Sequence, residues 1–368
     1  MTKSPESLRP PHTFVASASQ QVWDFPDLIL KARFADAVEA GASKYPIHRR
    51  LRFAARTDLD ELFDRVALDL GYHAQRLDSS SIMLDGESVF IVGRGGRKAA
   101  YCSCYFSIWA GNRDAAERAR ESLLGLVQQT RILEPMFSID WHFVTARGEL
   151  ESASIEELAD DILFDEAYPD IEGGLKNFIN RYLDAEETVL VLQGPPGTGK
   201  TRLIRAILGE ISRRRGGEAQ ALYTGDKKSL ENDQIFVRFI TGWEDVFVVE
   251  DADHLLKPRA KGNENLHRFL AIADGVVRAQ GRKIIFSTNL PNVGDLDDAL
   301  TRPGRCFASL FVRALGRAEA EAMLRRLCTD DELCAIAMRR LVSMEAATHS
   351  LAEIYLAARL AHEDRDRG

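Results

Sequence analysis

The second half of the chain alternates between short apolar runs and amphipathic segments. Four apolar runs have the length and composition of buried strands, at residues 188–193, 219–225, 246–250 and 283–288. Residues 201–215 and 266–280 have the spacing of helices and lie between these runs. Strands that alternate with helices predict an α/β fold, in which crossover helices cover a parallel sheet.

The first half gives a different pattern, which predicts a separate α+β domain. Three segments have helical spacing, at residues 29–41, 59–72 and 113–129. Four runs are typical of strands, at residues 81–85, 88–94, 98–109 and 137–146. The glycine-rich residues 93–98 predict a hairpin turn between two of these strands, and Asp58 is placed to cap a helix.

Segments between these blocks complete the predicted division of the chain. The first 25 residues are rich in Ser, Pro and Gln, which is typical of disorder. Ser154 and Glu157 have capping-box spacing, which predicts a helical linker. The predicted parts are a disordered tail (1–25), an α+β domain (26–150), a helical linker (151–185), an α/β core (186–312) and a helical C-terminal part (313–368).

Composition narrows the class of protein. Apolar residues make up 45% of 368 positions and charged residues 28%, which is ordinary for a globular protein. The net charge of −8 provides no overall basic field, so it disfavours binding to nucleic acid. Five cysteines, an odd number, favour a reducing compartment over a disulfide framework. No signal peptide and no run of ~20 apolar residues is evident, so we expect a cytoplasmic protein without a membrane span.

A glycine-rich loop stands directly after the run at residues 188–193. Its sequence, GPPGTGKT, matches G-x-x-x-x-G-K-[ST] between a predicted strand and a predicted helix, which is the context this motif requires. Glycines let several N–H groups face one point, and the helix adds the positive end of its dipole. The loop therefore predicts a phosphate site, with a glycine-rich turn that binds nothing as the alternative.

The phosphate loop implies specific roles for its residues. Lys200 is expected to neutralise the β- and γ-phosphates of ATP, and the Thr201 hydroxyl to join the shell of Mg²⁺. The predicted nucleotide-binding residues are Gly194, Pro195, Pro196, Gly197, Thr198, Gly199, Lys200, Thr201 and Arg202.

Two acids, Glu250 and Asp251, end the apolar run at residues 246–250. A phosphate loop of this kind needs an acidic strand end beside it in the sheet. The acids are therefore predicted to hold Mg²⁺ together with Thr201 and to activate the attacking water. The alternative is that they only cap the following helix.

Polar residues farther along extend the predicted catalytic set. Asn289 ends an apolar run, where its amide can orient the attacking water, although Asn also ends strands as turn chemistry. Arg302 and Arg305 would stabilise transition-state charge if they lie near a γ-phosphate, and otherwise they are surface arginines. The predicted catalytic residues are Glu250, Asp251, Asn289, Arg302 and Arg305.

Together, the strings GPPGTGKT, VFVVEDAD, FSTN and LDDALTRPGR resemble the AAA+ ATPases, and within them the mainstream AAA group. The resemblance covers about residues 165–360. It implies a P-loop AAA+ core with a small helical lid, acting as a homo-oligomeric ring that is usually a hexamer. In such a ring, Arg302 and Arg305 match the arginine fingers that reach a neighbour's nucleotide. Asn289 matches the residue called sensor 1.

The order Glu250–Asp251 reverses the usual Asp–Glu order of AAA strand ends. A similar order occurs in the branch that includes the mitochondrial AAA translocase of the Rieske iron–sulfur protein, and residues 263–276 resemble that branch as well. No counterpart of that translocase's membrane helix is expected. By position, Glu250 takes the magnesium role and Asp251 the catalytic role. If the roles follow residue type instead, they are exchanged.

Three functions are open at this stage. The first is an ATP-driven ring that remodels a protein partner bound through the N-terminal domain. The second is a nucleotide-gated oligomeric switch without translocation. The first is the leading one, but the second gains support because residues 225–234 lack the aromatic residue with which threading AAA unfoldases grip substrate, although Lys227, Lys228 and Leu230 are candidates to line a pore. The third, a DNA-dependent ATPase, is least favoured because the chain is acidic.

Overall fold

The computed structural model describes residues 25–39, 45–159, 163–216, 219–258, 266–273, 281–291, 295–300, 302, 304–342 and 346–367. The chain divides into two compact units, Met1–Leu133 and Glu134–Gly368, which are described separately. The predicted disordered tail lies outside the described residues except for Phe25, the first residue of α1 (Phe25–Glu39). Within the described part of the chain, no helix is long and apolar enough to cross a membrane.

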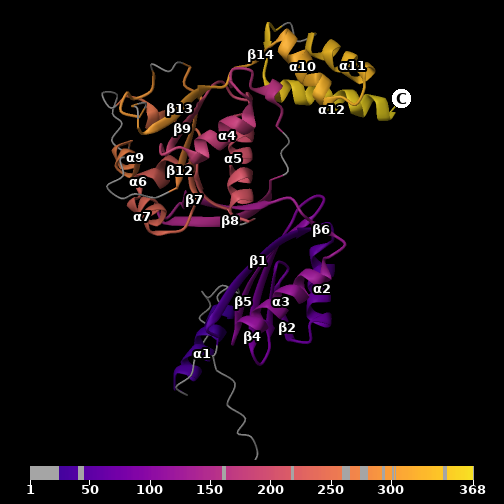
Figure 1. Ribbon diagram of the computed structural model, residues 1–368, viewed down its shortest axis with the longest axis vertical. Coiled ribbons are helices and arrows are strands. Elements are labelled where there is room, and N and C mark those ends of the chain that lie inside the picture. Colours follow the sequence, from indigo (N-terminus) through magenta and orange to yellow (C-terminus); the bar gives the residue numbers. More distant parts are fainter. Residues whose placement is uncertain are drawn as a thin grey trace, which may run out of the picture. The chain divides into compact units, whose positions relative to one another are not determined.

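The first unit is an antiparallel sheet with helices on both faces (Figure 1). Its strands, in the order β2-β3-β4-β5-β1-β6, are β1 (Ile47–Ala55), β2 (His73–Asp78), β3 (Ser81–Asp85), β4 (Val89–Arg97), β5 (Cys102–Ala110) and β6 (Arg131–Ile132). Helices α2 (Leu59–Asp69) and α3 (Arg113–Leu126) bury alternate strand residues such as Phe106. On the other face, α1 packs through Leu30.

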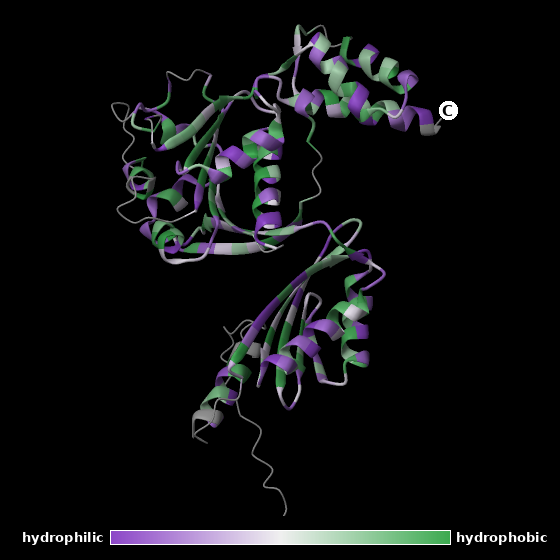
Figure 2. Ribbon diagram, in the orientation of Figure 1, coloured by the Kyte–Doolittle hydropathy of each residue, from purple (hydrophilic) through white to green (hydrophobic). Residues whose placement is uncertain are grey.

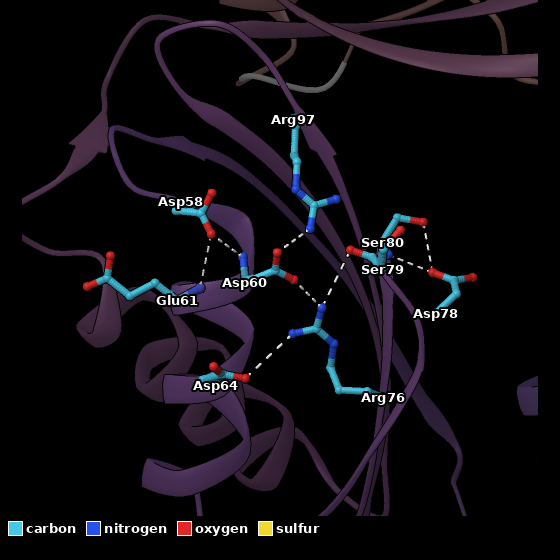
Figure 3. A network of polar contacts seen from close by, with 9 residues as sticks. All are labelled: Asp58, Asp60, Glu61, Asp64, Arg76, Asp78, Ser79, Ser80 and Arg97. Atoms are coloured by element: carbon cyan, nitrogen blue, oxygen red, sulfur yellow. Dashed lines mark hydrogen bonds and ion pairs between the residues drawn. The ribbon is translucent and has the colours of Figure 1, made fainter.

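A network of charged residues holds the start of α2 over the sheet (Figure 3). The predicted cap is confirmed, because the Asp58 carboxylate accepts hydrogen bonds from the N–H groups of Asp60 and Glu61 at 2.8 and 3.3 Å. Asp60 in turn pairs with Arg76 on β2 and Arg97 on β4, both at 2.6 Å, and these hydrogen bonds lower the pKa of its carboxyl group. Exposed pairs of this kind contribute little stability, so the network chiefly fixes where the helix begins.

The predicted turn at residues 93–98 is wrong, because the glycines lie inside β4. A Cβ atom on Gly93 would lie 2.5 Å from the ring of Phe106, and one on Gly95 would lie 2.3 Å from the side chain of Leu59. The glycines are therefore needed where the sheet closes against its own core, and the chain reverses only after the strand ends.

The second unit contains a mixed sheet in the order β13-β9-β12-β11-β10-β7-β8. Its strands are β7 (Met136–Val144), β8 (Leu150–Leu158), β9 (Val189–Gln193), β10 (Ala219–Thr224), β11 (Val246–Val249), β12 (Lys283–Thr288) and β13 (Cys306–Phe311). All neighbouring strands are parallel except β7 and β8. The predicted α/β fold with a parallel sheet is confirmed, although the sequence pattern did not reveal β13.

Helices cover both faces of this sheet (Figure 1). The helices are η2 (Asp165–Ala167), α4 (Leu175–Asp184), α5 (Lys200–Arg214), α6 (Lys227–Glu231), α7 (Asp233–Thr241), α8 (Asp253–Leu256) and α9 (Leu266–Ala273). Along β11, Val248 joins the core under α4 and α5, and Phe247 joins the core under α7 and α9. Strands buried on both faces are apolar throughout, and Figure 2 shows the central strands coloured as hydrophobic.

The C-terminal part is a small helical lid with a two-stranded sheet. Its elements are β14 (Leu315–Gly316), α10 (Arg317–Leu327), α11 (Asp331–Val342), β15 (Thr348–His349) and α12 (Leu351–Arg367). Arg313 donates to both carboxylate oxygens of Glu319 at 2.8 Å and pairs with Asp170 at 2.9 Å. This contact lowers the pKa of Glu319 to about 2 and ties the lid to the segment before α4.

The predicted boundary at residue 150 is wrong, and so is the helix expected just after it. Strand β7 pairs in parallel with β10, and β8 pairs with β7, so both strands belong to the second unit. Ser154 and Glu157, the supposed capping box, lie within β8, where the Ser154 hydroxyl donates to Asp140. The sequence pattern failed because β8 is an edge strand whose side chains are exposed or half-buried except for Leu158, so it lacks a continuous apolar face.

We expect a fragment that begins at residue 134 to be more stable than one that begins at residue 151. Removal of β7 would expose the backbone edge of β10, which invites aggregation. Thermal unfolding followed by circular dichroism would give a cooperative transition for the longer fragment and a lower Tm or precipitation for the shorter one. Equal Tm and equal solubility would contradict this assignment of β7 and β8.

Candidate nucleotide site

The glycine-rich loop joins the end of β9 to the start of α5. Gly194 and Gly199 have φ values of +148° and +102°, which residues with side chains rarely adopt. A Cβ atom on Gly194 would lie 2.0 Å from the carbonyl oxygen of Val312, so only glycine lets the loop pass this point. The Thr198 hydroxyl donates to the Pro195 carbonyl at 2.9 Å and closes the loop. The backbone therefore has the curled form that the motif predicts.

The side chain of Lys200 turns back into this loop. Its Nζ atom donates to the carbonyls of Gly194 and Pro195 at 2.7 and 2.9 Å, and to Asn289 Oδ1 at 3.0 Å. Lys200 is only 8% exposed, and this burial lowers the pKa of its ammonium group, while nearby carboxylates such as Asp251 oppose the shift. The loop thus holds a cation at the edge of the sheet where the strands end.

Glu250 follows β11 and faces the first turn of α5. Its Oε1 atom accepts a hydrogen bond from the Thr201 hydroxyl at 2.5 Å. Its Oε2 atom accepts one from the hydroxyl of Tyr223, on the neighbouring strand β10, at 2.7 Å. Both carboxylate oxygens therefore have donors, and one donor is the hydroxyl predicted to bind Mg²⁺.

Asp251 has a different set of neighbours. Its Oδ1 atom accepts a hydrogen bond from Asn289 Nδ2 at 3.1 Å, and Asn289 is also the residue that contacts Lys200. Asp251 has a φ of +50°, the only positive value at a residue other than glycine in the described backbone. Left-handed backbone of this kind costs free energy and clusters at functional sites. The two acids therefore point to different partners, although they are adjacent in sequence.

Tyr223 and Asp253 are polar residues beside this site that the sequence analysis did not single out. Asp253 Oδ1 accepts the backbone N–H of Asn289 at 2.7 Å and the hydroxyl of Thr288, so it fixes the end of β12. Asp253 was available in the string VFVVEDAD, as a third acid close to the strand end. Tyr223 lies on β10, the strand next to the one that ends in the two acids. In the sequence, only its place near the end of a predicted parallel strand could have indicated that it contacts the site.

The lid closes the other side of the loop. The backbone N–H of Ala352, near the start of α12, donates to the Gly197 carbonyl at 3.0 Å. The guanidinium carbon of Arg202 lies 3.8 Å from the centroid of the Tyr355 ring, so Arg202 stacks on α12. The lid is thus in direct contact with the phosphate loop and the first turn of α5.

An open pocket of about 490 Å³ lies between these elements, a volume within the range of small-molecule sites. Nine of the predicted site residues line it, namely Pro196, Gly197, Gly199, Lys200, Thr201, Arg202, Glu250, Asp251 and Asn289. Ser287, Leu351, Ala352 and Tyr355 complete the wall.

Arg302 and Arg305 do not line this pocket. Arg302 is exposed, and Arg305 donates to the carbonyl of Ala299 at 3.0 Å, just before β13. Neither arginine therefore belongs to the wall of the pocket in its own chain.

The candidate pore residues divide into two kinds. Lys227 and Lys228 are exposed at the start of α6, whereas Leu230 is 1% exposed and belongs to the core. The suggestion that Leu230 lines a pore is therefore wrong, because the short helix α6 turns it inward.

The donors present fit Mg²⁺ that arrives with a nucleotide. Thr201, Glu250 and Asp251 supply hydroxyl and carboxylate oxygens, which are the hard ligands that Mg²⁺ prefers. Among the described residues, no group of three or more His, Cys, Asp or Glu is arranged to hold a metal by itself. Mg²⁺ commonly binds through one or two carboxylates together with substrate phosphates, and this donor set matches that mode.

The sheet order, the loop and the acidic strand end define a P-loop protein of the α/β class. Residues 190–314 match the family described as "ATPase family associated with various cellular activities (AAA)". These residues are therefore similar in sequence to AAA domains, and the predicted fold class is confirmed.

Curated proteins with related sequences agree with this assignment. The human peroxisomal ATPase PEX6 is 29% identical over 189 residues, which cover 48% of this chain and 18% of PEX6. The ATP-dependent zinc metalloprotease FtsH of Acidothermus cellulolyticus is 31% identical over 157 residues, 39% of this chain and 23% of FtsH. The YME1 homologue of Caenorhabditis elegans is 30% identical over 174 residues, 44% of this chain and 22% of that protein. The matches thus span about a fifth of the length of these relatives.

We expect Asp253→Ala to destabilise the site, because it removes the acceptor for two donors at the end of β12. Unsatisfied donors of this kind cost about 1–3 kcal/mol in the free energy of unfolding. Denaturant unfolding would measure the loss, and nucleotide titration would show weaker binding. Asp253→Asn keeps one acceptor oxygen and is the matched control. An Asp253→Ala variant with unchanged stability and unchanged binding would contradict the role given to this carboxylate.

Proposed function

We propose that this chain hydrolyses ATP to ADP and phosphate. One observation carries the proposal: the residues of three separate sequence motifs, namely the phosphate loop, the acidic strand end and the segment that holds Asn289, meet in one pocket as hydrogen-bonded pairs. Thr201 is paired with Glu250, and Asn289 links Lys200 to Asp251. A glycine-rich turn without a ligand would not need these contacts, and a helix cap would not explain why the two acids face different partners.

In this proposal, the phosphate loop and Lys200 bind the phosphates of ATP. The curled backbone supplies N–H donors, and the ammonium group moves from carbonyl acceptors to the β- and γ-phosphates. Thr201 and Glu250 would hold Mg²⁺ with Asp251 nearby, and the ion would supply positive charge that neutralises the phosphates. Arg202 contributes to the wall of the same pocket, where it stacks on Tyr355.

Asp251 is proposed to act on the attacking water. Its carboxylate accepts a proton as the water oxygen bonds to the γ-phosphorus and the bond to the bridging oxygen of ADP breaks. Asn289 orients the carboxylate and the water through its amide. The hydrogen bond between Asn289 and Asp251 supports this division of roles, as does the different environment of Glu250.

Arg302 and Arg305 are proposed to act on the nucleotide of a neighbouring copy. They lie outside their own pocket, and a guanidinium group stabilises the charge that develops on the γ-phosphate. A closed ring of copies, a hexamer in our proposal, would bring them to each neighbour's site. Their position is also compatible with surface arginines, so the ring requires its own test.

The leading biological role is ATP-driven remodelling of a protein partner that binds through residues 26–133. The alternative is a nucleotide-gated oligomeric switch, which gains support because the described residues of the loop at 225–234 offer no aromatic side chain for gripping a threaded chain. The Glu250–Asp251 order supports placement near the branch of the Rieske-protein translocase. Of the residues 263–276 that carry part of that resemblance, only 266–273 are among the described residues.

We expect Asp251→Asn to retain ATP binding and lose turnover. The amide keeps the size of the carboxylate but cannot accept the proton of the attacking water. Glu250→Gln should instead weaken the effect of Mg²⁺ on nucleotide binding. Phosphate release and titration with a fluorescent ATP analogue would measure these effects separately. If Asp251→Asn hydrolyses ATP normally and Glu250→Gln does not, Glu250 is the catalytic residue and Asp251 serves Mg²⁺. The roles would then follow residue type rather than position.

We expect the ATPase rate per subunit to rise with protein concentration, because the arginines must come from a neighbour. Arg302→Ala/Arg305→Ala should be inactive alone, and mixing it with inactive Asp251→Asn should restore some activity. A rate per subunit that stays constant from dilute monomer upward would contradict a shared site. The same preparations distinguish the roles: a remodeller is stimulated by its protein substrate, a switch changes oligomeric state with ATP, and a DNA-dependent ATPase responds to DNA.

A further inference from the structure

Tyr223 lies outside every nucleotide motif, yet it contacts the nucleotide site. It is the fifth residue of β10, directly opposite Val248 of β11. The strand pairing places its side chain on the same face of the sheet as Glu250, and its hydroxyl donates to Glu250 Oε2 at 2.7 Å. The ring of Trp141, on β7, meets the Tyr223 ring edge-on at a centroid distance of 6.3 Å. Packing therefore fixes the ring, and the ring fixes the hydroxyl.

The two oxygens of Glu250 have separate donors. Thr201 donates to Oε1 and Tyr223 donates to Oε2, so the carboxylate plane has one orientation between α5 and β10. A glutamate has one more rotatable bond than an aspartate, and each free rotor costs entropy when a side chain must be held in place. The phenol limits this freedom and leaves Oε1 directed to the Thr201 side of the pocket.

We propose that Tyr223 is a positioning residue, which holds the longer acid Glu250 so that its carboxylate serves the metal side of the nucleotide site. The inference rests on the proposed ATPase function and deepens it. It explains how a glutamate can occupy a position where an aspartate is usual. The short side chain of an aspartate limits the positions of its carboxylate by itself, whereas the carboxylate of Glu250 is held by the Tyr223 hydroxyl on the next strand.

The chemistry of the phenol suits this role. A phenol is protonated at neutral pH, so the Tyr223 hydroxyl is a donor, and it donates to Glu250 Oε2 at 2.7 Å. Hydrogen bonds to charged acceptors are stronger than those between neutral groups. The hydroxyl does not need to touch the nucleotide, since it acts through Glu250.

The test compares Tyr223→Phe with the natural chain, because phenylalanine keeps the ring and removes only the hydroxyl. A fluorescent, non-hydrolysable ATP analogue is titrated into the full chain with EDTA and then with MgCl2. We expect Tyr223→Phe to bind the analogue equally well in EDTA, while the gain in affinity on adding Mg²⁺ falls by about fivefold to tenfold. Tyr105→Phe, in the first unit, is the matched control and should change neither value.

Two outcomes would overturn the proposal. One is that Tyr223→Phe gains as much affinity for the analogue on addition of Mg²⁺ as the natural chain does. The other is an equal loss of affinity with and without the metal, which would indicate a purely structural role. Absence of any Mg²⁺-dependent binding by the natural chain would instead reject the proposed ATPase function, so the two failures are distinguishable.

The same substitution in a Glu250→Asp protein is an independent test of whether Tyr223 acts through Glu250. In Glu250→Asp the shortened carboxylate cannot keep both contacts, so Tyr223→Phe should have no further effect on the gain with Mg²⁺. Binding of Mn²⁺ to the protein–analogue complex, measured by electron paramagnetic resonance, should show the same pattern. If Tyr223→Phe reduces the Mg²⁺-dependent gain in affinity equally in the natural chain and in Glu250→Asp, its effect does not depend on Glu250 and the proposal is wrong.

Discussion

The ammonium group of Lys200 is held almost out of water at the point where the parallel strands end, and the site is arranged around this buried charge. A buried cation is costly unless acceptors surround it. Two loop carbonyls and the amide oxygen of Asn289 are those acceptors, and Asn289 also reaches Asp251. The strand order β9-β12-β11 is what makes this possible, because it places the end of β12 between the loop and the acids.

The same constraint explains the second layer of contacts. Asn289 can serve Lys200 and Asp251 only if its backbone is fixed, and Asp253 fixes it through the N–H group. The lid and the segment before α4 also contact the phosphate loop. The hydroxyl of Tyr168 donates to the Gly199 carbonyl at 2.9 Å. A movement of the lid would therefore act directly on the groups around the phosphates.

The motif-bearing strands were predictable because each is a continuous apolar run that ends in a polar residue or a glycine. The edge strands were not. Residues 150–157 are exposed or half-buried, so their side-chain pattern carries little information. The pairing of β7 with β10 is a contact between segments about 80 residues apart. The glycines at 93–96 misled for a related reason, since they relieve a close approach between distant segments rather than form a turn.

The sequence by itself determined the class of fold, the phosphate loop and which residue types would meet there, because these depend on local spacing and on the rule that parallel strands end at one edge. Only the tertiary structure decided how the two acids differ. Glu250 and Asp251 are adjacent in sequence, and their separate roles follow from Tyr223 and Asn289, which stand on two other strands. Contacts between strands are set by sheet order and register, and no local pattern encodes them.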